Sequence, residues 1–515
     1  MARMHIATTH CRGQVGLHAP LVQVEVNLGS GLPQFTIVGL PETAVRESKE
    51  RVRAALGNCG FEFPAGRITV NLSPADLPKE GSRFDLPIAL GILLASAQLL
   101  PCTRPPAGAA AVPEFYGELG LSGELKPVKG LLLAAAHAQQ AHHEIFVPAA
   151  NADEVLLAGH GAVYAANHLL EVCAHLRGRA PSDLRRHGET RAQRGAAQHE
   201  GYDLDLRDVR GQHRAKRALL IAAAGSHSLL MIGPPGVGKT MLAQRLPALL
   251  PPLSRSEALE VAMIASTGGM PFEAREFGQR PFRAPHHTAS ASAIVGGGPC
   301  ARPGEASLAH HGVLFMDELP EFERRVLEAL REPLETGVVA VARARMQARY
   351  PAAFQLIAAM NPCPCGQLGD PTGTCTCTPP QVHAYRARIS GPLLDRIDLR
   401  IEVGRVATGE ITARVSEGDS SATAAAAVAR ARTRQLTRAG KLNRDLGASE
   451  LGACAWLAPA ARQLLEQSFE RLQLTARSYH RTLRVARTIA DLAGSETIEA
   501  LHVAEAVQLR RSLDA

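Results

Sequence analysis

The stretch Gly233-Pro-Pro-Gly-Val-Gly-Lys-Thr240 decides the fold of this chain. Its spacing is G-x-x-x-x-G-K-[ST], in which glycines let backbone N–H groups turn inward around phosphate oxygens. The apolar run at 229–232 predicts a buried strand before it, and residues 241–250 predict a helix after it. Strand, loop and helix in this order predict a phosphate-binding loop, because the helix amino terminus adds positive potential. A chance match in a Gly/Pro-rich loop is the alternative.

The loop predicts a site for the phosphates of ATP and for Mg²⁺. Lys239 is placed for the β- and γ-phosphates, and the Thr240 hydroxyl is placed for Mg²⁺. The predicted nucleotide-binding residues are Gly233, Pro234, Pro235, Gly236, Val237, Gly238, Lys239, Thr240 and Met241.

A second half of this site is predicted about 75 residues later, at Gly312-Val-Leu-Phe-Met-Asp317-Glu318. The apolar residues predict a buried strand that ends in two carboxylates, at the edge where open α/β sheets bind ligands. Asp317 would hold Mg²⁺ through water, and Glu318 would orient or deprotonate the attacking water. Alone, such a run is an ordinary strand end. After a phosphate-binding loop, it predicts the acidic pair of a nucleotide hydrolase.

Length and composition limit the number of domains and the classes of protein to which the chain can belong. Its 515 residues suggest two to four domains, and 46% hydrophobic but only 4% aromatic residues predict cores of Ala, Leu and Val. No run of 18 or more uncharged apolar residues occurs, and the first residues lack a secretory signal. We therefore expect no membrane span, a cytoplasmic location and no disulfides. The net charge of +7 is compatible with nucleic acid but is weak evidence for it.

Residues 1–178 predict an α+β domain, because stretches of period two alternate with stretches of helical spacing. Strands are expected at 21–28, 35–38, 68–72 and 144–147, and helices at 43–56, 85–100 and 131–140. Residues 179–200 are polar and basic and predict a flexible connector. Direct contact of its arginines with DNA is an alternative. We expect a motor core over 201–405 and an all-helical lid over 406–515, with helices at 422–436, 460–472, 478–493 and 498–511.

Three stretches of the first domain resemble the amino-terminal domain of the ComM/YifB family. They are Val38-Gly-Leu-Pro-Glu-Thr-Ala-Val-Arg-Glu-Ser, Pro78-Lys-Glu-Gly-Ser-Arg-Phe-Asp-Leu-Pro-Ile-Ala and Gly117-Glu-Leu-Gly-Leu-Ser-Gly-Glu-Leu-Lys-Pro-Val-Lys-Gly. That domain is similar to the proteolytic domain of Lon and to ribosomal protein S5. In a Lon-like alignment, Arg83 and Leu132 occupy the catalytic Ser and Lys positions. Because a Ser–Lys dyad needs both groups, we expect an assembly or DNA-guiding platform rather than a peptidase.

A Gly/Ser/Ala-rich segment, residues 282–298, separates the two halves of the nucleotide site. It is too irregular for a long helix, and such a loop inside a compact motor is often functional. Its Arg283-Ala-Pro-His-His-Thr resembles a motif of the Mg-chelatase ATPase subunit and of the ComM/YifB family, where this insertion projects toward a central pore. His286 and His287 are candidates for pore or phosphate contact, with a metal pair as the alternative.

Two further segments resemble parts of AAA+ ATPases. Residues 203–212 resemble the approach to the nucleotide, where Asp208, Val209 and Gln212 would lie near the adenine. An ordinary helix start is the alternative. The buried strand predicted at 354–360 ends in Asn361, where a sensor 1 amide would read the γ-phosphate. A buried amide without a partner would be costly there.

Residues 337–351 predict two strands around a basic turn that carries Arg343, Arg345 and Arg349. Three arginines on a hairpin suit a nucleic-acid backbone, because cations displace counterions from phosphates. The hairpin resembles the one before sensor 1 in MCM-like helicases and in the chelatase. An ordinary solvated turn is the alternative.

Four cysteines, Cys363, Cys365, Cys375 and Cys377, lie within fifteen residues bounded by Pro and Gly. Four thiols suit a tetrahedral Zn²⁺ ion, although C-x-C is less common than C-x₂₋₄-C. A redox pair and clustered free thiols are alternatives. Members of the ComM/YifB family carry Asn-Pro-Cys-Pro-Cys-Gly here, and this chain has it at 361–366.

Two arginines are candidates for contact with the nucleotide. Ser390-Gly-Pro-Leu-Leu-Asp-Arg396-Ile-Asp is similar to the MCM segment whose arginine finger reaches a neighbour's nucleotide. A helix-end salt bridge is the alternative for Arg396. Ser478-x-x-Arg481-x-Leu resembles the sensor 2 helix, so Arg481 would face the γ-phosphate. Arg484 competes for that role, and both could instead lie on a surface face.

The resemblance to ComM/YifB covers nearly the whole chain. It implies a multidomain α/β protein with a Lon-protease/S5-like α+β amino-terminal domain, an AAA+ P-loop α/β core and an α-helical lid. It further implies a hexameric ring that hydrolyses ATP and moves single-stranded or branched DNA, with branch-migration helicase activity during homologous recombination and natural transformation. The alternatives are a Mg-chelatase-like metal-insertion or protein-remodelling ATPase and an ATP-dependent protease.

Overall fold

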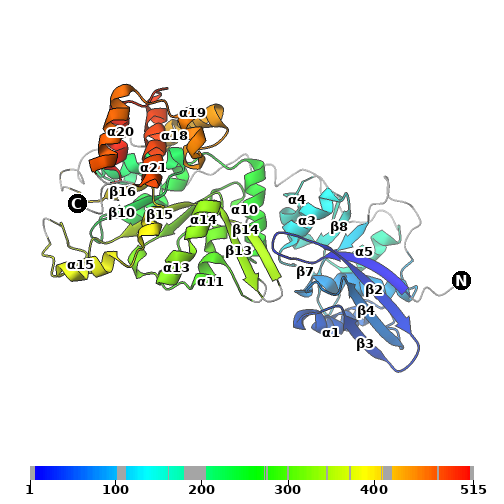
Figure 1. The fold of residues 1–515 in the computed structure, drawn as a ribbon. Coiled ribbons are helices and arrows are strands. Elements are labelled where there is room, and N and C mark those ends of the chain that lie inside the picture. Colours follow the sequence, from blue (N-terminus) through cyan, green and yellow to red (C-terminus); the bar gives the residue numbers. More distant parts are fainter. Residues whose placement is uncertain are drawn as a thin grey trace. The chain divides into compact units, whose positions relative to one another are not determined.

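A computed structural model describes residues 6–100, 112–159, 162–178, 204–271, 273, 276–298, 301–343, 346–370, 373–406, 409, 420–471 and 475–510. The chain divides into two compact units (Figure 1). The first contains residues 1–199, 258–278 and 344–348, and the second contains the rest. The predicted connector at 179–200 lies outside the described residues. In the part that is described, no helix is both long and apolar enough to cross a membrane.

The first unit is built on a seven-stranded mixed sheet with the order β3-β4-β2-β1-β5-β8-β9. Strand β2 pairs antiparallel with β1 and β4, and the other neighbours in this sheet are parallel. Its strands are β1 (Ile6–Arg12), β2 (Leu21–Gly29), β3 (Gln34–Val38), β4 (Arg67–Ser73), β5 (Pro113–Phe115), β8 (Glu144–Pro148) and β9 (Val163–Ala166). Strands β6 (Glu118–Leu119) and β7 (Leu125–Lys126) form a separate pair. The four strands predicted for this region are therefore confirmed.

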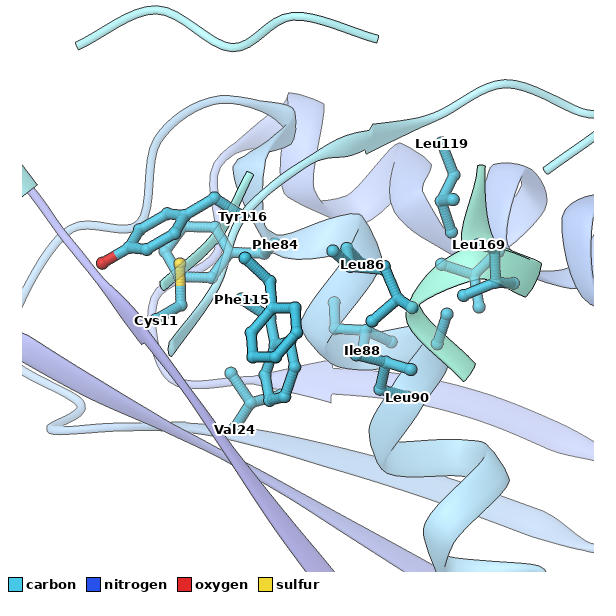
Figure 2. Packing of buried hydrophobic residues seen from close by; sticks show 14 of the residues in the cluster. Cys11, Val24, Phe84, Leu86, Ile88, Leu90, Phe115, Tyr116, Leu119 and Leu169 are labelled. Carbon is cyan, nitrogen blue, oxygen red and sulfur yellow. The ribbon is translucent and has the colours of Figure 1, made fainter. Parts of the chain in front are cut away.

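The helices of the first unit are α1 (Thr43–Asn58), α2 (Asp85–Ala95), α3 (Leu131–Gln140), α4 (Ala152–Leu156) and α5 (Leu169–Leu176). Helix α2 is buried almost all round, as its apolar sequence predicts. A Cβ at Gly91 would lie 2.5 Å from Val26 Cγ2, so α2 packs closely on β2 only because this residue is glycine. Figure 2 shows the core built around this helix. The prediction that it continues to residue 100 was wrong, because the backbone turns to φ +58° at Ala97.

The second unit is built on a five-stranded parallel sheet with the order β11-β12-β15-β10-β16. The strands are β10 (Leu229–Ile232), β11 (Phe282–Arg283), β12 (Val313–Met316), β15 (Gln355–Met360) and β16 (Leu399–Glu402). Every residue of β10, β12 and β15 is buried, which explains why all of them except Gln355 are apolar. Strands β13 (Val338–Arg343) and β14 (Met346–Pro351) form a separate hairpin, as predicted.

Helices surround this sheet and follow it in the chain. Those within the core are α7 (His213–Gly225), α8 (Lys239–Gln244), α9 (Leu246–Leu249), α11 (Ala291–Val295), α12 (Glu305–Leu308), α13 (Arg324–Ala329), α14 (Arg331–Thr336), α15 (Pro379–Arg386) and α16 (Gly391–Leu394). Helix α10 (Arg255–Thr267) contributes residues to both units. The single helix predicted over 241–250 is divided at Arg245, since Pro247 lacks the N–H that would continue α8.

The carboxyl-terminal region is helical, as predicted. Its helices are α18 (Ser421–Ala439), α19 (Ala448–Cys454), α20 (Pro459–Arg471), α21 (Ala476–Ala493) and α22 (Ala500–Gln508). Helix α19 was not predicted. Helices α18 and α21 pack against α7, and buried side chains of these helices and of the parallel sheet form one continuous core. This packing fixes α21, and with it Arg481, relative to the strands.

Candidate functional site

The predicted phosphate-binding loop connects β10 to α8 at the carboxyl edge of the parallel sheet. Gly233 follows β10 directly, and a Cβ there would lie 2.1 Å from the carbonyl oxygen of Val403. Gly236 and Gly238 have φ of +79° and +92°, a conformation that favours glycine. Close packing at one glycine and left-handed backbone at two others explain why the loop needs this sequence.

Lys239 and Asn361 meet beneath this loop. The Lys239 ammonium donates hydrogen bonds to the carbonyls of Gly233 at 2.6 Å and Pro234 at 2.9 Å, and to Asn361 Oδ1 at 3.2 Å. Burial lowers the pKa of Lys239, and the charges of Asp317 and Glu318 oppose that shift. The structure thus brings a cation and a polar amide from β15 to the place where phosphate is predicted.

Thr240 and Asp317 complete this part of the site. The Thr240 hydroxyl donates to Asp317 Oδ2 at 2.7 Å, so two hard oxygen donors lie side by side. Hydroxyl, carboxylate and water oxygens are the donor set that Mg²⁺ prefers, and the pair fits that ion. The other oxygen of Asp317 accepts the backbone N–H of Glu318 at 2.9 Å.

Glu318 has an unusual backbone conformation and an unexpected partner. Its φ is +52°, in the left-handed region, where a side chain costs about 1–3 kcal/mol. Its carboxylate lies 3.2 Å from Nδ1 of His287, and both side chains are partly exposed. The neighbouring His286 instead contacts the Thr288 hydroxyl at 2.9 Å. The segment predicted to be functional therefore contacts the acidic pair through one histidine.

The residues predicted near the adenine lie beside the loop. Gln212 donates to the carbonyls of Gly404 at 2.7 Å and Val237 at 3.4 Å. Asp208 pairs with Arg245 at 2.9 Å. Val209 is buried, whereas the Met241 side chain is 42% exposed at the start of α8. The structure brings this segment and the phosphate-binding loop together.

The four clustered cysteines follow Asn361 directly. The sulfurs of Cys363, Cys365 and Cys375 lie 3.4–3.7 Å apart, and the Cys377 sulfur lies within 4.8 Å of the others. Four sulfurs about 2.3 Å from a tetrahedral zinc ion would lie about 3.8 Å from one another. The thiol set therefore fits zinc. Backbone hydrogen bonds from Gln367 and Thr376 lower the pKa of Cys365 to about 6, which favours its thiolate. At Cys375 and Cys377 backbone hydrogen bonds act in the same direction, but burial and the neighbouring thiols raise the pKa, to about 12 for Cys375.

The cysteine loop also contacts the phosphate-binding loop. Gly366 has φ +78°, and a Cβ there would lie 2.8 Å from Cδ of Pro235 and 3.8 Å from Cγ of Asn361. A side chain at this glycine would therefore displace the proline ring. The cysteine loop and the phosphate-binding loop are therefore in direct contact.

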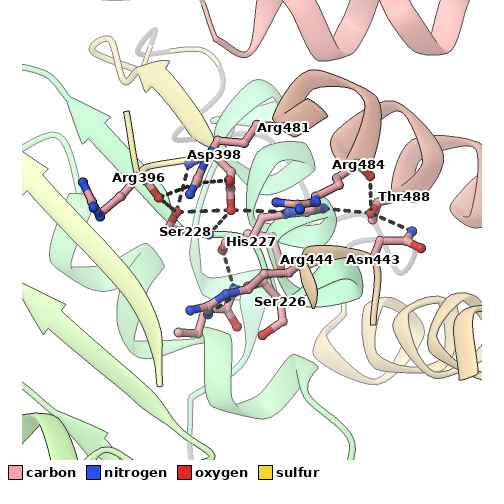
Figure 3. A network of polar contacts seen from close by, with 12 residues as sticks. Ser226, His227, Ser228, Arg396, Asp398, Asn443, Arg444, Arg481, Arg484 and Thr488 are labelled. Atoms are coloured by element: carbon pink, nitrogen blue, oxygen red, sulfur yellow. Dashed lines mark hydrogen bonds and ion pairs between the residues drawn. The ribbon is translucent and has the colours of Figure 1, made fainter. Parts of the chain in front are cut away.

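Arg396 and Arg481 lie at the other edge of the same sheet. Asp398, between them, directly precedes β16, and Ser228 directly precedes β10. Asp398 accepts hydrogen bonds from the Ser228 backbone N–H at 3.2 Å and from Arg481 Nη1 at 2.6 Å (Figure 3). Arg481 also donates to the Arg396 carbonyl at 2.8 Å. Because β10 has four residues, about 13 Å of strand separates these arginines from the phosphate-binding loop.

Asp398 anchors this second cluster. Burial opposes its ionisation, but a hydrogen bond from His227 and the charge of Arg481 hold its pKa well below the usual range. His227 in turn contacts the Thr488 hydroxyl at 2.8 Å. The carboxylate therefore stays charged and fixes the α21 arginine against the sheet.

A cavity of about 900 Å³ opens beside this cluster. Its arginines are Arg280, Arg396, Arg432, Arg444, Arg477, Arg481 and Arg484, and its acidic residues are Glu257, Glu335, Asp398 and Asp445. Glu335 pairs with Arg396 Nη2 at 2.8 Å and with Arg477. The excess of positive charge suits an anionic ligand. Arg484 donates to the Leu446 carbonyl rather than to Asp398.

The predicted DNA-binding arginines are only partly described. Arg349 is exposed on β14. Arg343 ends β13, but its side chain and the whole of Arg345 lie outside the described residues. The structure therefore describes the backbone of both hairpin strands and the side chain of one of the three arginines.

Sequence reasoning missed several residues of these sites. His227, Glu335, Asp398 and Arg477 belong to no recognisable spacing, and their partners are far away in the chain. The Ser228–Asp398 bond, for example, spans 170 positions. For His287, the Pro-His-His-Thr stretch was a usable signal, although Glu318 as its partner was not predicted.

Comparison with known proteins places the whole chain among related ATPases. Family models described as "Magnesium chelatase, subunit ChlI", "Subunit ChlI of Mg-chelatase" and "Magnesium chelatase, subunit ChlI C-terminal" match residues 205–411, 24–151 and 418–510. The chain is 47% identical to Competence protein ComM of Haemophilus influenzae over 98% of both proteins. It is 48% identical to YifB of Escherichia coli K12, over 98% of this chain and 97% of that protein. Identity to the Magnesium-chelatase 38 kDa subunit of Rhodobacter capsulatus is 28%, over 30% of this chain and 48% of that protein.

Proposed function

The chain belongs to the ComM/YifB family of Mg-chelatase-like AAA+ proteins, and on this premise we propose that it is a ring-forming ATPase that moves DNA. The activity would be helicase action on single-stranded or branched DNA that promotes branch migration during homologous recombination. A near full-length relative named as a competence protein supports a role in natural transformation. The exposed Arg349 on a two-stranded hairpin supports contact with a phosphate backbone.

Each proposed role in hydrolysis follows from the contacts at the carboxyl edge of the sheet. Residues 233–241 would hold the nucleotide, with Lys239 against the β- and γ-phosphates. Asn361, already hydrogen-bonded to Lys239, would sense the γ-phosphate. Thr240 and Asp317 would hold Mg²⁺, which supplies positive charge to the phosphates when bound. Glu318 would accept a proton from, or orient, the attacking water.

The observation that carries the proposal of a ring is the position of Arg396 and Arg481. Both lie at the amino edge of the sheet, about 13 Å of strand away from Lys239, so they cannot reach the phosphates held by their own chain. A cavity rich in arginine next to them suits the phosphates of a second copy's nucleotide. Arg396 would then act as a finger and Arg481 as sensor 2 on the neighbour's γ-phosphate. A closed ring, proposed to be a hexamer, gives every copy such a neighbour.

We assign the cysteine loop as a structural zinc site. Four thiols whose sulfurs all lie within 4.8 Å of one another suit a closed tetrahedral site, whose zinc would hold the loop in place. Gly366 packs directly against Pro235. A cysteine loop held rigid by zinc would therefore also hold the phosphate-binding loop in position.

The amino-terminal domain, proposed to be Lon/S5-like, would serve as a platform rather than a peptidase. Arg83 is buried and donates to Gln14 Oε1 at 3.3 Å and to the Lys129 carbonyl at 2.9 Å. Leu132 is fully buried. Neither residue offers a nucleophile or a base, which supports a scaffold role for the domain.

The second candidate is a Mg-chelatase-like or protein-remodelling ATPase without helicase activity. The magnesium chelatase family model that matches residues 205–411 favours it for the motor region. However, the match to the chelatase 38 kDa subunit covers 30% of this chain, whereas the match to the competence protein covers 98%. The relative that matches this chain over nearly its whole length is therefore the one named as a competence protein, and this favours the helicase proposal.

The test is displacement of a labelled strand from forked and three-stranded DNA with ATP. The wild type is expected to displace the strand, whereas Lys239→Ala and Glu318→Gln are each expected to fall at least 100-fold, since each removes a group that acts on the transferring phosphoryl. Hydrolysis of ATP that DNA neither stimulates nor couples to displacement would overturn the helicase proposal in favour of the second candidate. Activity retained in both variants would overturn the assigned site.

A further inference from the structure

The seven arginines that line the cavity beside Asp398 differ in the groups they bond. Four of them donate hydrogen bonds to backbone carbonyl oxygens, namely Arg280, Arg432, Arg444 and Arg484. Arg481 pairs with Asp398, which is buried and therefore cannot leave cheaply. Arg396 and Arg477 pair instead with Glu335. These two arginines thus share one carboxylate partner, whereas the other five are tied to the fold.

Glu335 bridges the two guanidinium groups with its two oxygens. Its Oε2 lies 2.8 Å from Nη2 of Arg396, and its Oε1 contacts Nη2 of Arg477. Arg396 also donates through Nη1 to the Pro392 carbonyl at 2.7 Å, which fixes the direction of its guanidinium. Carboxylate and phosphate oxygens present similar acceptors to an arginine. The Glu335 carboxylate therefore occupies an anion-binding position that Arg396 and Arg477 form.

This position is more cationic than Glu335 alone can balance. Arg477 lies four residues before Arg481 on α21, so both side chains project from the same face of the helix. Burial, and then the like charges of Arg331 and Arg481, lower the pKa of Arg396 and of Arg477. An anion with more charge than one carboxylate would relieve this repulsion.

Glu335 is also placed so that it can leave. Its side chain is 36% exposed, and that of Arg477 is 46% exposed, so the pair between them is weak and a displaced carboxylate regains water. Glu335 lies in the last turn of α14, where the helix dipole disfavours a negative charge. Asp398, by contrast, has no such route to solvent. A multiply charged phosphate can therefore displace Glu335 without disturbing Arg481.

We propose that Glu335 is an internal competitor for the neighbour's nucleotide. In an unassembled copy, its carboxylate fills the place between Arg396 and Arg477 that a terminal phosphate takes in the ring. ATP held by one copy displaces Glu335 of the next copy, and Arg477 becomes a third arginine at that phosphate. Ring assembly thereby depends on bound ATP. This inference rests on the proposed function, because the phosphate belongs to a nucleotide held by a second copy.

The direct test is calorimetric titration of the full chain with inorganic pyrophosphate. It uses a Lys239→Ala background, which weakens anion binding at the phosphate-binding loop. Adding Glu335→Gln is expected to tighten pyrophosphate binding about two- to fivefold, the range that an exposed ion pair supports. Adding Arg477→Ala to that variant is expected to remove the gain. Equal affinity with and without Glu335→Gln would overturn the inference.

The second test measures the ATP concentration at which half of the protein is assembled, by analytical sedimentation. Glu335→Gln is expected to lower this concentration about two- to fivefold. Glu332→Gln makes the same charge change on the same helix, outside the residues that line the cavity, and is expected to match the wild type. If Glu335 only held the arginines in position, Glu335→Gln would need more ATP and lose kcat, and that result would overturn the inference. Wild-type assembly that ATP does not promote would instead count against the proposed function.

Discussion

Asp398 is the residue on which the arginine half of the site depends. It is buried, it pairs with Arg481, and it bonds the residue that precedes β10. Removing one partner of a buried ion pair leaves the other without compensation, and that cost exceeds the net value of the pair. The carboxylate therefore links the position of the arginines to the stability of the whole second unit.

We predict that Asp398→Asn destabilises the protein by about 3 kcal/mol or more, because Arg481 loses its buried partner. The measurement is urea unfolding at pH 7. Asp395→Asn, three residues away and only half-buried, is the matched control and is expected to change stability by less than about 1 kcal/mol.

The same carboxylate predicts how this difference depends on pH. The pKa of Asp398 is lower in the folded chain than the ordinary unfolded value of about 3.9, so its contribution is fully present above that value. It is lost as pH falls below about 4, because the unfolded chain then binds the proton first. The wild type and Asp398→Asn should therefore converge in stability below about pH 4. Equal urea midpoints at pH 7 would show that the pair has no such role.

At the scale of elements, the cysteine loop and the phosphate-binding loop act as one piece. Their contact is a proline ring against a glycine with left-handed backbone, and this geometry leaves no room for a Cβ. The phosphate-binding loop must present its N–H groups within a fraction of an ångström, so any shift of Pro235 is transmitted to the nucleotide.

We predict that Gly366→Ala raises KM for ATP on the order of tenfold, because a misplaced loop binds phosphate less well. Gly369→Ala is the matched control. Gly369 lies in the same loop with φ +77°, but a Cβ there meets nothing within 4 Å. It carries the same backbone strain without the contact. Bound zinc, measured by elemental analysis, is expected to be equal in both variants, and equal KM values would refute the proposed contact.

The elements that sequence reasoning predicted are those with local signals. Apolar runs predicted strands β10, β12 and β15, and the spacing of the glycines predicted the phosphate-binding loop. The end of α2 was wrong because a positive φ at Ala97 has no signature in composition. The counter-ions of the arginines could not be predicted, since Glu335 and Arg396, or His227 and Asp398, meet only after the sheet has formed.

At the scale of the whole molecule, the residues proposed for catalysis lie at opposite edges of one sheet. Lys239, Thr240, Asp317 and Glu318 lie at the carboxyl edge, and Arg396 and Arg481 at the amino edge. In the proposed scheme, each half lacks what the other supplies, namely phosphate-binding groups on one side and arginine cations on the other. Complete sites would therefore form only between copies.

We predict that Lys239→Ala and Arg396→Ala, each inactive alone, regain hydrolysis when mixed before assembly. Random mixing makes roughly one interface in four intact, so about a quarter of wild-type kcat is expected. A mixture of Lys239→Ala with Glu318→Gln has both defects in the same half and is expected to stay inactive. Failure of the first mixture, or wild-type activity of Arg396→Ala by itself, would show that sites form within one chain.

The placement of the two half-sites has a genetic consequence. In a ring, each copy contributes its carboxyl edge to one interface and its amino edge to another. A copy that is altered at one edge can therefore still assemble into the ring. Such a copy inactivates the interface formed by its altered edge, even though the neighbour at that interface is normal. In a cell that carries both alleles, an Arg396 allele should therefore leave about half of the interfaces active, spread over nearly every ring. An allele that makes no protein should leave the same number of active interfaces, but in fewer rings that are each fully active.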